Sequence, residues 1–497
     1  MTAAGQGLTR RALLAGTAAG AAESALGGGA SGAPAPGPVA VDVHCHTFCS
    51  ADLPIVGFVA HQIPGLTEIS RFFTRWPEVI VRTLLGAVTT LPNAVAPAGD
   101  AELAALRALA AQPGAPVPPV PPLPDGAAES LVTSAVKHLP VTIGPEQRRV
   151  VARTLEALYL VAHPRAAIAA TLVQMFPSVS LFTPALVDYD AWSDDRSPTP
   201  LWQQVLVQER IARLGVAGRL GRPEARVHPF VAFDPRRQAE AASAGTPERP
   251  PPPGPGSSAL ELVGWAIASG GFLGVKLYPP VGFAPFDNAR LHPELPFAPG
   301  LDRALGALYG FCEAAEVPIL THSSASNEYG LGLRRLVEPA RWAPVLERFP
   351  KLRLDFGHFG GELRGWVDQA VALIDRYPNV YADLSNSALV YDDAFAGRLQ
   401  ATLAELLAAH PKLKRRLMYG SDWWLSALDP AAARAVDRFR SVLGAVLTAD
   451  ELADLMGRNA LRFLGLLDEQ NRPRAGASAH RLRAFYGAAP RPVWLAA

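Results

Sequence analysis

The chain has little of what several common kinds of site require. Its three cysteines, Cys45, Cys49 and Cys312, are too few and too unevenly spaced for a disulfide framework or a cysteine-based zinc site. Only 18% of the 497 residues are charged and the formal net charge is +1, which leaves no basic stripe for nucleic acid or anionic lipid. We therefore expect neither nucleic acid nor membrane among its partners.

Two catalytic motifs are also missing. No Gly-x-Ser-x-Gly sequence marks a nucleophilic serine, and the glycines at 27–29 lack the strand and helix that flank a phosphate-binding loop. The hydrophobic fraction is 49%, which indicates a well-filled core. The length accommodates one large barrel domain of about 250 residues with substantial additions.

The N-terminus resembles a twin-arginine export signal. Arg10 and Arg11 stand directly before a small-residue apolar run, Ala12 to Ala22, and a Gly/Pro/Ala-rich spacer follows up to Pro38. We expect residues 1–38 to be a signal with its spacer and the protein to be exported, periplasmic or extracellular. The alternative is a tail with a chance arginine pair, which would leave the protein in the cytoplasm.

From Val39 onward, short apolar runs alternate with longer helical patterns, as in repeated βα units. The runs predicted as strands are Val39 to His46, Val179 to Val187, Arg226 to Phe233, Phe272 to Tyr278, Val317 to His322, Leu352 to His358, Val380 to Leu384 and Leu417 to Asp422. Helical segments between them include Leu201 to Leu214, Leu301 to Ala315, Trp342 to Phe349, Leu363 to Arg376, Phe395 to Ala409 and Ala431 to Leu443. Eight such strands predict an α/β fold, the (β/α)₈ TIM barrel.

A long insertion separates the first two strands. The barrel is expected over residues 39–470, with a helical subdomain at about 49–175 and a C-terminal extension at 471–497. Helical patterns within the insertion cover Ile69 to Leu85, Ala101 to Ala111 and Glu146 to Ala162. An insertion after strand one either shapes the pocket, since barrel sites lie at the C-terminal strand ends, or serves as an embellishment or homo-oligomer contact.

Metal-capable side chains stand at the ends of several strands. In the first strand, alternation places Asp42, His44 and His46 on one face, where two imidazoles can reach one metal ion. A lone histidine is usually a core residue, and even a His-x-His pair arises by chance.

Three more strands strengthen this interpretation. His322 and His358 close the fifth and sixth strands, and Asp422 closes the eighth. In a barrel, these strand ends meet at a single rim.

Motifs along the barrel resemble the amidohydrolase superfamily, and more narrowly its amidohydrolase-related branch with the aminocarboxymuconate-semialdehyde decarboxylase-like enzymes. These motifs are DVHCH at 42–46, AFDP at 232–235, GVKLYPP at 274–280, PILTHSS at 318–324, LDFGHFGG at 354–361, YADLS at 381–385, YGSDW at 419–423 and GRNALRFLGL at 457–466. They extend from strand one to the final helix and leave the insertion uncovered.

The resemblance implies that His44, His46, His322 and Asp422 bind one divalent metal, commonly zinc. Imidazole and carboxylate ligands also suit manganese or iron. The resemblance further implies that His358 activates water or polarises the substrate. Asp422 is expected to accept a proton from water while binding the metal; its alternative role is that of a ligand only.

Four residues are expected to line a substrate pocket: Lys276, Tyr278, Asn327 and Trp423. Some superfamily members carry a carboxylated lysine that bridges two metals at the position of Lys276. The GVKLYPP context favours the mononuclear branch, in which the lysine anchors substrate. Aromatic residues at such positions serve packing as often as binding.

The expected function is hydrolysis of an amide, ester, lactone or related carbonyl bond in a small molecule by a metal-activated water. A metal-dependent decarboxylase or hydratase of a carboxylated substrate is the alternative, because the same metal acts as a Lewis acid in both reactions. A third hypothesis is a binding protein that keeps the barrel without turnover.

Overall fold

The computed structural model describes residues 39–54, 86, 88, 95–112, 114–124, 126–137, 144–192, 196–241, 250–325, 333–361, 363–385, 393–423 and 432–495. The predicted signal with its spacer, the helical pattern at 69–85 and the pocket residue Asn327 lie outside these residues.

Parallel strands occupy all eight regions that the sequence predicts as strands. They are β1 (Ala40–Cys45), β2 (Val179–Pro184), β3 (Arg226–Val227), β4 (Phe230–Ala232), β5 (Gly274–Leu277), β6 (Ile319–His322), β7 (Leu354–Gly357), β8 (Val380–Asp383) and β9 (Leu417–Met418). The third predicted region is divided into β3 and β4 by His228 and Pro229. Proline has no amide hydrogen, so it cannot donate to the strand ladder there.

The strands follow one another in chain order around a ring. One sheet has the order β1-β2-β3 and the other β4-β5-β6-β7-β8-β9, with parallel ladders throughout. A bridge between Ala185 and Phe230 joins the two sheets. Hydrogen bonds from the Val43 amide to the Tyr419 carbonyl (3.1 Å) and from the Asp422 amide to the His44 carbonyl (2.8 Å) join β1 to the segment after β9. The predicted (β/α)₈ architecture is confirmed, with bridging hydrogen bonds instead of ladders at these two junctions.

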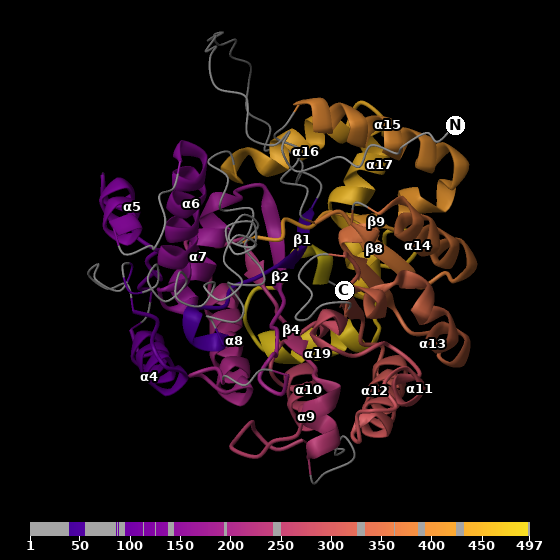
Figure 1. Ribbon diagram of the computed structural model, residues 1–497, viewed down its shortest axis with the longest axis horizontal. Helices are drawn as coiled ribbons and strands as arrows, with labels where there is room; N and C mark the ends of the chain where they lie inside the picture. Colours follow the sequence, from indigo (N-terminus) through magenta and orange to yellow (C-terminus); the bar gives the residue numbers. More distant parts are fainter. Residues whose placement is uncertain are drawn as a thin grey trace.

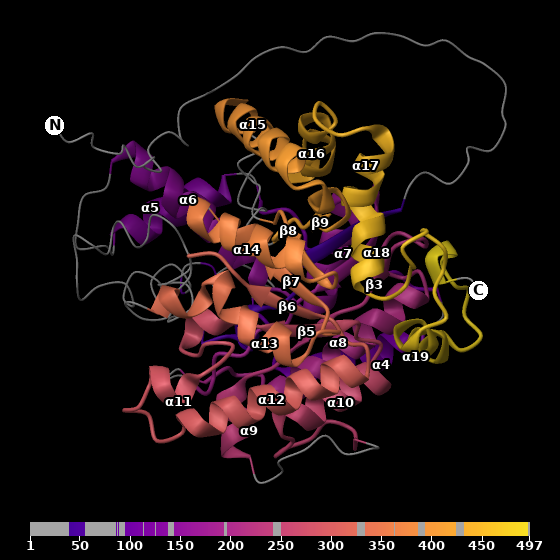
Figure 2. The ribbon, with the colours of Figure 1, turned by 90° about the vertical axis from the view of Figure 1, so that its right-hand side faces the viewer.

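Helices surround the strands; α10 and α12 lie below them and α15, α16 and α17 above (Figures 1 and 2). The helical patterns predicted between strands coincide with α8, α12, α13, α14, α15 and α16. None of the helices in the described ranges is long and apolar enough to cross a membrane. The α-helices are α4 (Gly99–Ala110), α5 (Ala127–Lys137), α6 (Pro145–Val161), α7 (Arg165–Met175), α8 (Leu201–Val216), α9 (Pro235–Glu240), α10 (Ala259–Ala268), α11 (Asn288–Leu291), α12 (Ala298–Ala314), α13 (Ala343–Arg348), α14 (Arg364–Arg376), α15 (Asp393–Ala409), α16 (Ala435–Leu443), α17 (Ala449–Ala453), α18 (Asn459–Phe463) and α19 (Ala477–Tyr486).

The C-terminal helices pack against the strands. The centre of the Phe463 ring on α18 lies 5.4 Å from the centre of the Tyr381 ring on β8 and 6.4 Å from that of the Phe230 ring on β4. The Tyr486 hydroxyl of α19 lies 3.1 Å from His228 Nε2. Part of the segment predicted as a C-terminal extension is therefore in contact with the barrel.

In the described part of the region between β1 and β2, four helices, α4 to α7, gather on one flank of the strands (Figure 1). Two of them, α4 and α6, match predicted helical patterns. The last, α7, leads directly into β2 and packs beside α8. It therefore takes the place of the crossover helix that a parallel β1-β2 pair requires.

A buried arginine joins this region to the barrel. Arg165 begins α7, and its guanidinium donates to Asp52 after β1, to Glu102 on α4 and to Thr199 before α8. The Arg165 side chain is fully buried, and so are both carboxylates. Removing one partner from such a cluster leaves uncompensated charge in a low-dielectric environment, which is strongly destabilising.

We predict that Arg165→Met lowers the free energy of unfolding by about 3–5 kcal/mol, because Asp52 and Glu102 are left without their cation. Urea unfolding followed by circular dichroism measures the change. The control is Arg364→Met: the Arg364 guanidinium pairs with Asp368 and Glu405 at the exposed surface, where ion pairs contribute little, so this variant should unfold nearly as the wild type does. An equal loss of unfolding free energy in the two variants would contradict the role of Arg165 in joining the inserted helices to the barrel.

Candidate functional site

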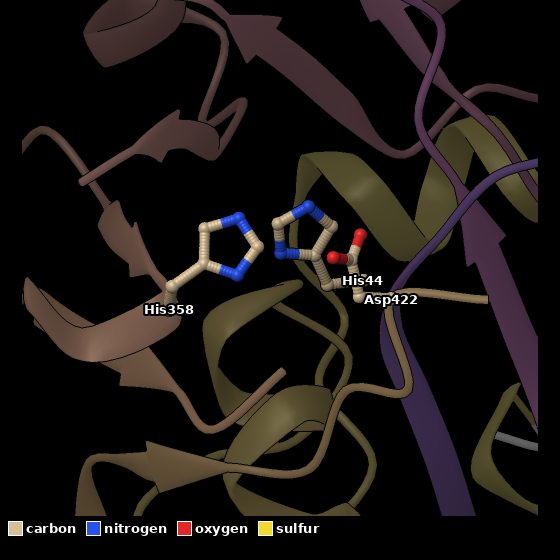
Figure 3. A group of neighbouring side chains, drawn as sticks. All are labelled: His44, His358 and Asp422. Atoms are coloured by element: carbon tan, nitrogen blue, oxygen red, sulfur yellow. The ribbon is translucent and has the colours of Figure 1, made fainter. Parts of the chain in front are cut away.

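The candidate site lies at the C-terminal ends of the strands. His44 is on β1, His322 ends β6, His358 follows β7 directly, and Asp422 comes after β9. The pairing register of β1 with β2 shifts between Asp42 and Cys45, so strict alternation is not kept there. Figure 3 shows the His44 ring between the His358 ring and the Asp422 carboxylate.

Three of the predicted site residues form a group that could hold a metal ion. One ligand atom from each of His44, His358 and Asp422 lies within 4.8 Å of the others. His46 Nε2 lies 3.4 Å from Asp422 Oδ1, and His322 Nδ1 lies 3.1 Å from His358 Nε2. The structure thus brings all five residues together, with His358, predicted as the water-handling residue, inside the tightest group.

Hydrogen bonds indicate which ring nitrogen carries the hydrogen in His44, on β1, and in His46, directly after it. His44 Nδ1 lies 2.9 Å from Asp383 Oδ2, and His46 Nδ1 lies 2.8 Å from the Ala185 carbonyl. An ionised carboxylate and a carbonyl both accept only, so each Nδ1 carries the hydrogen and each Nε2 keeps its lone pair. Metal-binding histidines are commonly held in this way. With the Asp422 carboxylate, the two Nε2 atoms form a donor set that fits a divalent metal.

The ionisation states suit the same purpose. Burial and the nearby Lys276 lower the pKa of His44 to about 3, and burial with His358 lowers that of His322 well below its usual value. Burial also lowers the pKa of His358. Burial alone would raise the pKa of Asp422, but the neighbouring His46, His358 and His44 hold it below the ordinary value. At neutral pH the site therefore presents His44, His322 and His358 as uncharged imidazoles and Asp422 as an ionised carboxylate, the forms that bind metal.

Lys276, predicted for the pocket, is fully buried and reaches the first histidine. Its Nζ donates to His44 Nε2 at 2.9 Å. Burial lowers the pKa of this ammonium to about 8, although Asp383 and Asp422 act in the opposite direction. Lys276 therefore lies at the inner side of the site, in contact with a predicted ligand.

The other pocket predictions fall in different places. The centre of the Tyr278 ring lies 4.8 Å from the centre of the His322 ring and 5.2 Å from that of the Tyr189 ring. The two tyrosines therefore form an aromatic wall beside the site. Trp423 is fully buried, and its indole N–H donates to Met175 Sδ on α7 at 3.2 Å. This position favours the packing role for Trp423.

Two residues of the YADLS motif were not assigned from the sequence. Asp383 Oδ1 accepts the backbone amides of His358 and Ser385, both at 3.0 Å, while Oδ2 faces His44. Ser385 Oγ lies 2.8 Å from His358 Nδ1 and 3.1 Å from His44 Nδ1. Burial would raise the pKa of Asp383, but the interactions with His44 and His358 lower it well below its usual range. Their only signal in the sequence was polar residues at the end of an apolar strand.

The backbone is strained at two site residues. His358 has φ of 69° and Asp422 has φ of 47°, in the left-handed region that non-glycine residues seldom adopt. Such conformations cost about 1–3 kcal/mol each and persist where the surroundings enforce them. Here the His358 amide is held by Asp383 Oδ1 and the Asp422 amide by the His44 carbonyl.

Two glycines leave room for the first histidine. A Cβ on Gly357 would lie 3.0 Å from His44 Cε1. A Cβ on Gly420 would lie 2.9 Å from His44 Cβ and 3.1 Å from Ser385 Cβ. All three distances are shorter than ordinary van der Waals contact, so any larger residue must displace the imidazole or its neighbour.

We predict that Gly420→Ala lowers the free energy of unfolding by about 1–3 kcal/mol, because an extra methyl group overfills a packed site. It should also weaken binding of added Zn²⁺, since His44 is displaced. Urea unfolding and zinc titration measure the two effects. Gly397→Ala is the control: nothing lies within 4 Å of its added Cβ on exposed α15, and it should stabilise the helix by about 0.5–1 kcal/mol. A Gly420→Ala protein with unchanged stability and zinc affinity would refute the steric argument.

Comparison with solved structures finds barrels of low identity. An uncharacterized TIM-barrel protein from Bordetella bronchiseptica is 16% identical, with a TM-score of 0.39, and the match covers 86% of this chain and 98% of that one. 5-Carboxyvanillate decarboxylase from Sphingomonas paucimobilis is 16% identical, with a TM-score of 0.34 and coverage of 58% and 79%. A zinc-bound amidohydrolase from Burkholderia multivorans is 16% identical, with a TM-score of 0.36 and coverage of 62% and 91%. TM-scores of this size place no constraint on function.

Family membership rests on a separate comparison. No curated protein matches the sequence significantly. The family model described as amidohydrolase matches residues 209–466, just over half of the chain. The match includes His322, His358 and Asp422 and excludes β1 with His44 and the following His46. The chain belongs to the amidohydrolase family.

Proposed function

We propose that this amidohydrolase-family enzyme is a metal-dependent hydrolase that acts on an amide, ester, lactone or related carbonyl bond of a small molecule. The observation that carries the proposal is the grouping of His44, His358 and Asp422 within 4.8 Å at the C-terminal strand ends. In barrel enzymes this end of the strands is where catalysis takes place. Uncharged imidazoles beside an ionised carboxylate can bind a metal and exchange a proton.

His44 and His46, each with its lone pair on Nε2, would hold one divalent ion together with His322 and the Asp422 carboxylate. Zinc fits a set of imidazoles and one carboxylate, and manganese or iron accept the same ligands. When bound, the ion supplies Lewis acidity toward a carbonyl oxygen and lowers the pKa of water.

The protein's own residues then handle protons and position the substrate. Asp422 is ionised and faces His46 at 3.4 Å, so it can take a proton from water attacking the substrate. His358 lies across the group from Asp422 and can deliver a proton to the leaving group. The tyrosine wall of Tyr189 and Tyr278 provides an apolar surface beside His322 for the substrate.

We predict that His44→Ala and Asp422→Ala each bind less than a tenth of the wild-type zinc, because each removes one member of the ligand set. Changes to residues that only surround a metal site already reduce metal affinity by roughly 10- to 100-fold. Metal content after equilibration with Zn²⁺ and gel filtration measures this. His410→Ala is the matched control: the His410 imidazole pairs with Asp375 near the end of α14, and its loss should leave zinc content unchanged. Full zinc content in either site variant would contradict the proposed ligands.

The reaction type is tested with two panels of substrates on the zinc-loaded protein. We expect hydrolysis of an ester, lactone or amide that is abolished by a chelator and restored by zinc, manganese or iron. Carbon dioxide released from aromatic or unsaturated carboxylic acids, without hydrolysis in the first panel, would assign a lyase reaction to the same site. Inertness of the metal-loaded protein on both panels would favour a binding protein.

A further inference from the structure

Two polar residues have no role in the proposed catalysis: Asp383, which ends β8, and Ser385, which follows it. We propose that Asp383 and Ser385 are positioning residues: Asp383 fixes the tautomer and orientation of His44 for metal binding, and Ser385 fixes those of His358. This inference rests on the proposed metal site. Neither residue needs to touch the metal or the substrate.

The contacts of Asp383 assign each of its oxygens. Oδ1 accepts two backbone amides, those of His358 and Ser385, and Oδ2 is left for His44 Nδ1 at 2.9 Å. A carboxylate can only accept, so the hydrogen of the His44 imidazole lies on Nδ1. The Nε2 lone pair consequently points away from Asp383, toward Lys276 Nζ at 2.9 Å. Asp383 therefore selects Nε2 as the nitrogen that keeps the lone pair a metal needs.

The direction of the next hydrogen bonds follows from this assignment. Because His44 Nδ1 is a donor, it cannot accept the Ser385 hydroxyl hydrogen at 3.1 Å. His358 Nδ1, at 2.8 Å, is the acceptor that remains among the ring nitrogens near Ser385 Oγ. The hydrogen of the neutral His358 ring then lies on Nε2, from which it points to His322 Nδ1 at 3.1 Å. One carboxylate thus sets the proton order of two histidines, with His44 as a lone-pair donor and His358 as a proton donor.

This arrangement makes asparagine at position 383 an informative substitution. The amides of His358 and Ser385 still require an acceptor, so the Asn side-chain oxygen replaces Oδ1 and its NH₂ group replaces Oδ2. An NH₂ group facing His44 Nδ1 forces the hydrogen onto Nε2, the nitrogen needed for the metal. Asp383→Asn preserves size and shape while reversing the His44 tautomer.

The experiment compares the full-length wild type with Asp383→Asn, Ser385→Ala and Asp375→Asn. Zinc affinity is measured by competition with a chromogenic chelator, and imidazole tautomers by ¹⁵N NMR of metal-free protein labelled at histidine. Asp375→Asn is the matched control, because Asp375 accepts from His410 Nδ1 at 2.6 Å in the same kind of pair away from the site. Thermal unfolding by circular dichroism reports whether each variant folds.

We expect Asp383→Asn to weaken zinc binding by about 10- to 100-fold and to move the His44 hydrogen from Nδ1 to Nε2. Ser385→Ala should change the His358 signals and reduce zinc affinity less than Asp383→Asn does. Asp375→Asn should leave zinc affinity and the site signals as in the wild type. A merely structural role would lower the melting temperature without reversing the tautomer.

Three results would overturn the inference: an Nε2-protonated His44 in the metal-free wild type, unchanged zinc affinity in folded Asp383→Asn, or an equal loss in Asp375→Asn. If Asp383→Asn does not fold, the wild-type tautomer and Ser385→Ala still decide. Failure of the wild type to bind zinc, manganese or iron would remove the proposed function, whereas metal binding that is indifferent to Asp383→Asn would remove only this inference.

Discussion

A buried carboxylate must be surrounded by hydrogen-bond donors. Asp383 has this requirement at the C-terminal end of the barrel, and neighbouring strands supply the donors. Taking an ionised carboxylate out of water costs several kcal/mol unless hydrogen bonds and opposite charge compensate. The compensating groups come from β1, through the His44 ring, and from the turn after β7, through the His358 amide. Three strands must therefore be in place before this charge is stable. Closure of the ring and assembly of the site are consequences of the same interaction.

The same region contains backbone strain and tight packing. His358 and Asp422 adopt positive φ, and His44 is confined between Gly357 and Gly420. Strain of this kind is unfavourable locally and is stabilised by surrounding contacts, which leaves each side chain few alternative positions. The barrel thus supplies rigidity where imidazole and carboxylate atoms must stay within reach of one another. Preorganised donors need little rearrangement when charge develops during a reaction.

Much of the fold could be predicted because strands buried on both faces read as short apolar runs, and all eight such runs are strands. The five predicted site residues meet because the ends of parallel strands share one rim. The roles of Asp383 and Ser385 were beyond prediction, since the contact from Asp383 to His44 spans 339 residues of sequence. Trp423 illustrates the same limit: its sequence position is compatible with pocket or core, and only its contact with Met175 decides.

The hydrogen-bond order also bears on the division of labour among the histidines. His358 lies in the tightest group with His44 and Asp422, which on distance alone suggests a ligand. However, both of its ring nitrogens are engaged, Nδ1 with Ser385 and Nε2 with His322. A neutral imidazole has one lone pair, and in the proposed proton order that of His358 accepts from Ser385. His46, in contrast, donates to the Ala185 carbonyl and presents Nε2 to Asp422. Hydrogen bonding therefore favours His46 as the ligand and His358 as the proton donor, although proximity alone would rank them in the opposite order.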